Sequence, residues 1–314
     1  MSAAKKKHRT ADAHPFGPLP GFVRLMFTRP WRQITLSVML CALLAGSFFW
    51  LWQRAGEEVI QADIYQITPE KIVITPPPNW IHSDIKAEAI TSGSLEGKQS
   101  LLDDELTERV ARAFSLHPWV ARVESVRKSH PARIEVMLVY RRPVCMVATG
   151  GGLLPIDADG IVLPRADFSP IEASRYPRLE GIHTGPLGPV GTRWGDERVH
   201  SGAQLAAALL DDWNDLGLEK IVPSEPNPQG GTQPLAFDLL SSGGSRIHWG
   251  SAPDSPLPGE IPAGEKLAHL KKYVAEHGSL EGPSGRPQEI DLRHVQLRIA
   301  PRTARSAELQ RQDR

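Results

Sequence analysis

The residues of this chain that could support catalysis or metal binding are scattered rather than grouped. Eleven histidines are present, but no pair has the H-E-x-x-H spacing that places two imidazoles on one helix face, and Cys41 and Cys145 form no C-x-x-C motif. Ser245 has no base near it in the sequence, and no G-x-S-x-G or G-x-x-x-x-G-K motif occurs. We therefore predict no metal site, no cofactor, no small-molecule substrate and no enzymatic activity.

Two groups of carboxylates have simpler interpretations than catalysis. The segment Asp157–Gly160 resembles the start of a calcium loop, but Ala166 stands where an EF-hand needs its bidentate Glu, which favours a hairpin turn. Asp211, Asp212 and Asp215 fall on the polar side of a predicted helix, where acidic side chains are usually solvated. Neither group predicts a site.

The strongest signal is an uninterrupted apolar run from Ile34 to Trp52, 19 residues without a charge. As a helix it is about 28 Å long, which matches the hydrocarbon thickness of a bilayer. A buried core helix of this length would seldom be apolar on all sides. A cleaved signal peptide is the other alternative, but the run exceeds the usual apolar region and no A-x-A site follows it. We predict one uncleaved membrane span.

The charges that flank the run predict its orientation. Residues 1–32 contain seven Lys or Arg against one acid, Asp12, whereas the rest of the chain carries 29 basic and 35 acidic residues. A short basic segment stays in the cytoplasm, so the larger C-terminal part should lie outside it. The cluster Lys5–Arg9 needs no nucleic acid to explain it. These patterns predict a single-pass type II protein of the cytoplasmic (inner) membrane, with an extracytoplasmic or periplasmic body.

Beyond the span, hydrophobic periodicity predicts a mixed α+β protein in two parts. In the first part Ile134, Val136, Leu138 and Tyr140 alternate with period two, as in a half-buried strand. Its order is strand, helix, helix, strand, strand: Lys71–Thr75, His82–Ile90 (capped by Ser83 or Asn79), Leu101–Ser115, Trp119–Lys128 and Arg133–Arg141.

The second part is predicted to be rich in strands, with two flanking amphipathic helices. The helices are expected over Glu197–Leu216 and Lys266–Glu276. The strands are expected over Val144–Ala148, Leu153–Asp157, Ile161–Leu163, Lys220–Val222, Leu235–Leu240, Arg246–Trp249 and a final Glu289–Ile299.

Several strings resemble the FtsQ/DivIB family of bacterial cell-division proteins. The run His117-Pro118-Trp119-Val120, then Val123–Lys128, Pro131 and Tyr140–Val144, is similar to the end of that family's POTRA domain. Leu154–Pro164 resembles its next hairpin, and Ile290–Arg293 resembles its "vDLR" strand. The resemblance implies a basic cytoplasmic tail (1–32), a span (33–53), a connector (54–70), a POTRA-like domain (71–142), an FtsQ-type β domain (143–299) and a disordered tail (300–314).

The resemblance also implies a function: a non-catalytic scaffold of the divisome at the division septum, which recruits or regulates septal cell-wall synthesis proteins. Its implied partners are FtsB/FtsL-like bitopic division proteins and other divisome components. A POTRA-bearing component of envelope transport or assembly is the alternative, but it should show tandem POTRA units or repeated ten-residue barrel strands, which the sequence lacks.

The final strand is the predicted partner-binding element, because an edge strand can accept a strand from another protein. In a strand over Glu289–Ile299, alternate side chains face opposite sides. On the residues alone, an edge strand that only completes its own core is as good an interpretation, and the resemblance favours the interface. The expected binding residues are Ile290, Leu292, Arg293, His294, Val295, Leu297 and Ile299.

Overall fold

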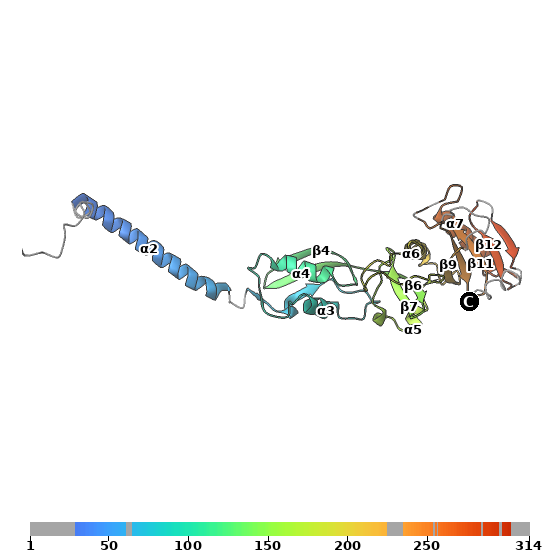
Figure 1. The fold of residues 1–314 in the computed structure, drawn as a ribbon, viewed down its shortest axis with the longest axis horizontal. Coiled ribbons are helices and arrows are strands. Elements are labelled where there is room, and N and C mark those ends of the chain that lie inside the picture. Colours follow the sequence, from blue (N-terminus) through green and yellow to red (C-terminus); the bar gives the residue numbers. More distant parts are fainter. Residues whose placement is uncertain are drawn as a thin grey trace, which may run out of the picture. The chain divides into compact units, whose positions relative to one another are not determined.

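The computed structural model describes residues 29–60, 65–224, 235–253, 255, 257–283, 285–294 and 297–302. The chain divides into two compact units, residues 1–65 and 66–314, and each is considered by itself. In the first unit, helix α2 spans Arg29–Ile60 (Figure 1). Within it, Gln33–Gln53 is long and apolar enough, by length and composition, to cross a membrane. The predicted apolar helix is therefore present.

The second unit begins with a three-stranded sheet of order β2-β5-β4. Strand β2 (Ile72–Ile74) is parallel to β5 (Arg133–Tyr140), and β5 is antiparallel to β4 (Val120–Ser129). Helices α3 (Ile85–Ser92) and α4 (Leu106–Ser115) lie beside this sheet (Figure 1). Their buried side chains share one core with those of the sheet. The alternation predicted for β5 is confirmed over residues 133–138, since Ile134, Val136 and Leu138 are buried and the residues between them are exposed.

The starts of these two helices differ from the prediction. Helix α3 is capped by Asp84, whose carboxylate accepts a hydrogen bond from the N–H of Ala87, so neither Ser83 nor Asn79 is the cap. Helix α4 begins at Leu106, five residues later than expected. Residues 101–105 form turns instead, after a small ladder between β1 (Gln66–Ile67) and β3 (Gln99–Ser100).

An eight-stranded sheet forms the rest of the unit, in the order β13-β12-β11-β10-β9-β8-β6-β7. Three neighbouring pairs are parallel (β6 with β8, β8 with β9, and β11 with β12), and the others are antiparallel. The strands are β6 (Pro143–Thr149), β7 (Gly152–Asp157), β8 (Arg178–Leu179), β9 (Leu218–Pro223), β10 (Phe237–Ser241), β11 (Arg246–Gly250), β12 (Gln288–Asp291) and β13 (Arg298–Pro301).

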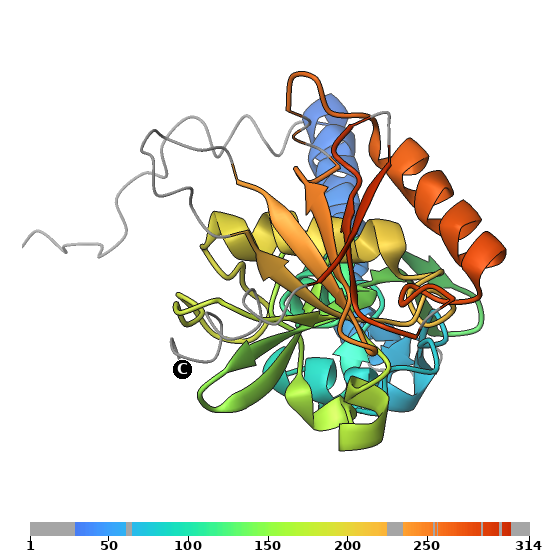
Figure 2. The same ribbon diagram turned by 90° about the vertical axis from the view of Figure 1, so that its right-hand side faces the viewer.

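Helices α6 (Glu197–Leu209) and α7 (Ala263–His277) bury their apolar sides against this sheet (Figure 2). Leu205 of α6 and Leu270 of α7 lie in one core with Trp249 of β11. The short helix α5 (Pro170–Ala173) precedes β8. The mixed α+β class with a strand-rich C-terminal region is confirmed.

Three further differences concern the second sheet. Helix α6 ends at Leu209, not Leu216, because the following Asp- and Asn-rich residues form turns that close at Gly217, whose φ is +64°. Residues 161–163 make only isolated bridges. The predicted strand over 289–299 is wrong: the chain reverses between β12 and β13, which pair antiparallel with Ile290 opposite Ile299.

Candidate partner-binding surface

Strand β13 is the outermost strand of the large sheet. Among the described strands it pairs only with β12, and its four residues are all exposed. The backbone N–H of Arg302 then donates a hydrogen bond to the carbonyl of Pro287, which fixes the end of the hairpin. One side of the β13 backbone therefore has no partner in the described sheet, and such an edge can accept another strand.

The hairpin separates the predicted binding residues into two groups. Ile290 and Leu292 are fully buried in the core of the large sheet, and Leu297 packs against that core. Arg293 and His294 are exposed in the turn. Ile299 is 45% exposed on β13, and Val295 lies outside the described residues. The structure thus does not bring the seven residues onto one accessible surface, since the chain reversal turns the first part inward.

An aspartate turn explains why β12 stops where it does. The Asp291 carboxylate accepts hydrogen bonds from the N–H of Arg293 (3.0 Å) and from its guanidinium (Nε 2.9 Å, Nη2 2.6 Å). Burial by itself would raise the pKa of Asp291, but these bonds lower it to about 2. An aspartate that bonds the backbone two residues on is a turn signal. The Asp-x-Arg string could therefore have predicted the hairpin.

A charged cluster connects β12 to the strands behind it. His248 of β11 lies between two carboxylates, with Nδ1 2.9 Å from Asp238 Oδ1 and Nε2 2.7 Å from Glu289 Oε1. Arg246 donates two hydrogen bonds to the other Asp238 oxygen (2.9 and 2.6 Å). Since Glu289 belongs to β12, His248 links the terminal hairpin to the body of the sheet.

This cluster predicts that the hairpin is held more weakly as the pH rises. The hydrogen bond to Asp238 raises the pKa of His248, and that to Glu289 adds to it, against the effect of burial. A raised folded pKa means that the stabilisation is complete below about pH 6.5 and is lost as the pH rises through the folded value.

The wild type should be more stable than His248→Gln at low pH. We expect this difference in the free energy of unfolding to shrink by about 1–2 kcal/mol between about pH 5.5 and 8.5. Urea unfolding at a series of pH values measures it. The Asp291 carboxylate also interacts with His248, and its pKa of about 2 keeps it charged over this range. Parallel pH profiles for wild type and variant would contradict the prediction.

A second polar cluster joins the two cores of the unit. Asp167, which follows β7, is buried, and its Oδ2 accepts hydrogen bonds from Trp119 Nε1 (2.5 Å) and Ser83 Oγ (3.0 Å). The Asp167 carbonyl lies 3.0 Å from His82 Nδ1. Leu163, four residues before it, packs in the core of the three-stranded sheet. The segment 163–168 therefore fastens the large sheet to the smaller one.

Removing the Asp167 side chain should loosen this junction. In Asp167→Ala the indole N–H of Trp119 is left buried without its acceptor, which should lower the free energy of unfolding by about 2–3 kcal/mol. The exposed Asp159→Ala in the neighbouring turn is the matched control, with an expected change below about 0.5 kcal/mol. Urea unfolding of the two variants measures the difference. Equal losses of stability in the two variants would contradict a stabilising role for the hydrogen bonds of Asp167.

The residues considered for chemistry have structural roles. No group of three His, Cys, Asp or Glu in the described part of the chain could hold a metal ion. Asp157 accepts the N–H groups of Asp159 and Ile161, which confirms the predicted hairpin turn. Ser245 is buried and donates to the Leu280 carbonyl. Burial raises the pKa of the Cys145 thiol, so this buried cysteine is a poor nucleophile.

Comparison with known proteins agrees with this description. No family model matches the chain. It is similar to the cell division protein FtsQ of Anaeromyxobacter sp. (strain K), with 30% identity over 205 residues, which are 62% of this chain and 61% of that protein. The chain thus spans about three fifths of the length of that relative. One apolar helix followed by an α+β region fits a membrane-anchored protein.

Proposed function

We propose that this chain is a non-catalytic scaffold of cell division, anchored in the cytoplasmic membrane by α2 with its N-terminus inside. Its extracytoplasmic part recruits or regulates septal cell-wall synthesis proteins, and its partners are FtsB/FtsL-like bitopic proteins. The similarity to a cell division protein supports the division role. Apart from the two-residue strand β3 between the helices, the order β2, α3, α4, β4, β5 is strand, helix, helix, strand, strand, and it supports the assignment of residues 71–142 as a POTRA domain.

The observation that carries the binding mechanism is the open edge at β13. In an antiparallel pair, directly opposite side chains share a face, so Ile299 lies on the same face as the buried Ile290. That face is the one covered by the core, yet Ile299 remains 45% exposed at its margin. A partner strand paired with β13 would extend the sheet and cover Ile299, with main-chain bonds for affinity and side-chain contacts for selectivity.

We therefore assign direct binding to the exposed residues of the hairpin, Ile299, Arg293 and His294. Ile290 and Leu292 hold the hairpin on the core, so they support the edge without touching a partner. Leu297 packs at the margin of the core.

A pull-down from membranes with full-length protein tests this assignment. We expect Ile299→Asp to reduce capture of an FtsB/FtsL-like partner at least tenfold, because a carboxylate at the covered position must be desolvated. Met137→Asp is the matched control: Met137 is 49% exposed, but on β5, the central strand of the other sheet. Equal capture by both variants would rule out the β13 edge.

Two independent measurements test the division role and the topology. A fluorescent fusion should concentrate at the septum of dividing cells, and an even distribution around the envelope would contradict the proposal.

Protease added to intact spheroplasts should digest the C-terminal part, and its protection would contradict the extracytoplasmic placement.

A further inference from the structure

A pocket lies beside the junction between the two sheets, separate from the β13 edge. It has a volume of about 170 Å³, far above the 10–15 Å³ that one water needs. Its aromatic lining comes from both sides of the junction: Trp80 precedes α3, whereas Phe168 and Tyr176 flank α5. Phe168 and Tyr176 meet edge to face, with centroids 5.8 Å apart, and so form a corner. Aromatic faces carry the negative part of the ring quadrupole and attract cations.

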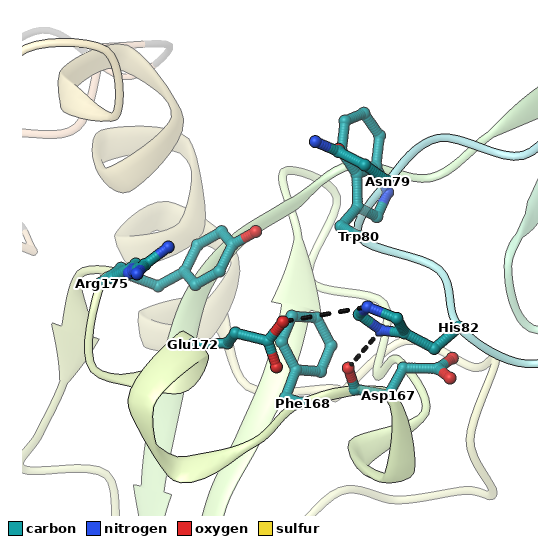
Figure 3. Close-up of a pocket in the computed structure, with 8 residues that line it drawn as sticks. Asn79, Trp80, His82, Asp167, Phe168, Glu172 and Arg175 are labelled. Atoms are coloured by element: carbon teal, nitrogen blue, oxygen red, sulfur yellow. Dashed lines mark hydrogen bonds and ion pairs between the residues drawn. The ribbon is translucent and has the colours of Figure 1, made fainter.

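Two hydrogen-bond acceptors face each other across this pocket, Glu172 and His82 (Figure 3). Glu172 Oε2 accepts the N–H of Ser169 and caps α5, which leaves Oε1 directed toward His82, 3.9 Å from its Nε2. Hydrogen bonds from Ser169 lower the pKa of Glu172, so it is anionic. His82 Nδ1 contacts the Asp167 carbonyl, which can only accept, so Nδ1 carries a proton, and whenever the ring is neutral Nε2 is an acceptor.

The charges of the lining also favour a cation. Among the eight lining residues Asp167 and Glu172 are acidic and Arg175 is basic. Figure 3 shows Arg175 at the end of the pocket away from His82. Beside the Glu172–His82 pair the pocket therefore has a carboxylate, an imidazole and aromatic walls, and Arg175 is the one arginine or lysine among its eight lining residues.

We propose that this pocket binds the arginine side chain of a partner protein. A guanidinium is planar, stacks on aromatic rings and carries several diverging donors, which suit two acceptors about 4 Å apart better than the compact ammonium of lysine does. The pocket shares no residue with β13. A partner could thus engage both surfaces, and the failure of one assignment would not affect the other.

The test uses full-length protein in nanodiscs, labelled with ¹⁵N at tryptophan, and the indole signal of Trp80 as reporter. Trp80→Phe assigns this signal. We expect Nα-acetyl-arginine amide to shift it saturably in the millimolar range. The probe Nα-acetyl-citrulline amide has nearly the same shape without the charge, and should bind at least tenfold more weakly.

The matched variant is Glu172→Gln, because glutamine also completes the capping box and preserves α5. It should weaken arginine binding about tenfold, whereas Glu108→Gln on the exposed face of α4 should leave binding unchanged. Equal binding of citrulline, or no effect of Glu172→Gln, would overturn a cation site. Equal binding of Nα-acetyl-lysine amide would overturn the choice of arginine.

One further comparison tests the origin of the arginine. The chain itself has Arg305, Arg311 and Arg314 after the described part. If a chain that ends at Arg302 shows a shifted Trp80 signal and binds the arginine probe more tightly, then the tail occupies the pocket, and the proposal of a separate partner is wrong. An unchanged spectrum and affinity support it.

Discussion

Replacement of Lys266 by methionine should be among the most destabilising single changes in this protein. Lys266 lies on α7, and its Nζ is 2.6 Å from Glu260 Oε2. Only 2% of the Lys266 side chain and 9% of the Glu260 side chain are exposed. Burial by itself would raise the pKa of Glu260, but the bonds from Lys266 and Ser251 lower it, so the carboxyl group is ionised. Removing the cation leaves a buried carboxylate without its partner, which costs about 3–5 kcal/mol.

Urea unfolding of full-length protein measures this loss. The control is Lys271→Met on the same helix, which removes the more exposed ion pair between Lys271 and Asp212. It should cost at most about 1 kcal/mol. A double variant, Lys266→Met with Glu260→Gln, should recover more than half of the loss because no unpaired charge remains. If the double variant is no more stable than Lys266→Met alone, packing rather than charge accounts for the effect.

Replacement of Leu292 by aspartate should have an effect of similar size. Leu292 is completely buried beside Ile290, and its N–H donates to the His248 carbonyl at 3.1 Å. The substitution removes an apolar side chain and places a carboxyl group in the core, so we expect a loss of about 4 kcal/mol or more. Circular dichroism and urea unfolding should both report it.

The contrast with Ile299→Asp separates folding from binding. That change lies on the exposed β13, so it should cost about 1 kcal/mol or less while it abolishes partner capture. If Leu292→Asp instead unfolds like the wild type and loses only its partner, then Leu292 lies at an interface and the packing described here is wrong.

The helix and strand patterns of this chain were largely readable in its sequence. Alternation at Ile134, Val136 and Leu138 predicted β5, and the apolar spacing of α4 predicted its buried side. Such patterns are visible because each element must bury one face, and that requirement repeats at a fixed period. The ends of elements were less predictable. Asp84 marks the start of α3 and Asp291 the end of β12, through short-range side-chain bonds that a periodic pattern does not contain.

The candidate surfaces depended on contacts between distant residues. The binding residues chosen from the last strand remain a prediction, and Ile290 and Leu292 among them lie in the core, because alternation cannot tell a core from an interface. Only the pairing of β12 with β11 and β13 shows which side is covered. The junction was not predicted at all, since Trp119 and Asp167 are 48 residues apart.

The sequence alone determined that this protein has one long apolar helix and a mixed α+β region, because length, charge and period are local properties of the chain. The tertiary structure decided where the last strand reverses, which edge stays open, and how Glu172 and His82 come to face one another. These depend on the order in which strands pair and on the side chains that each pairing buries, and no local property of the chain specifies that order.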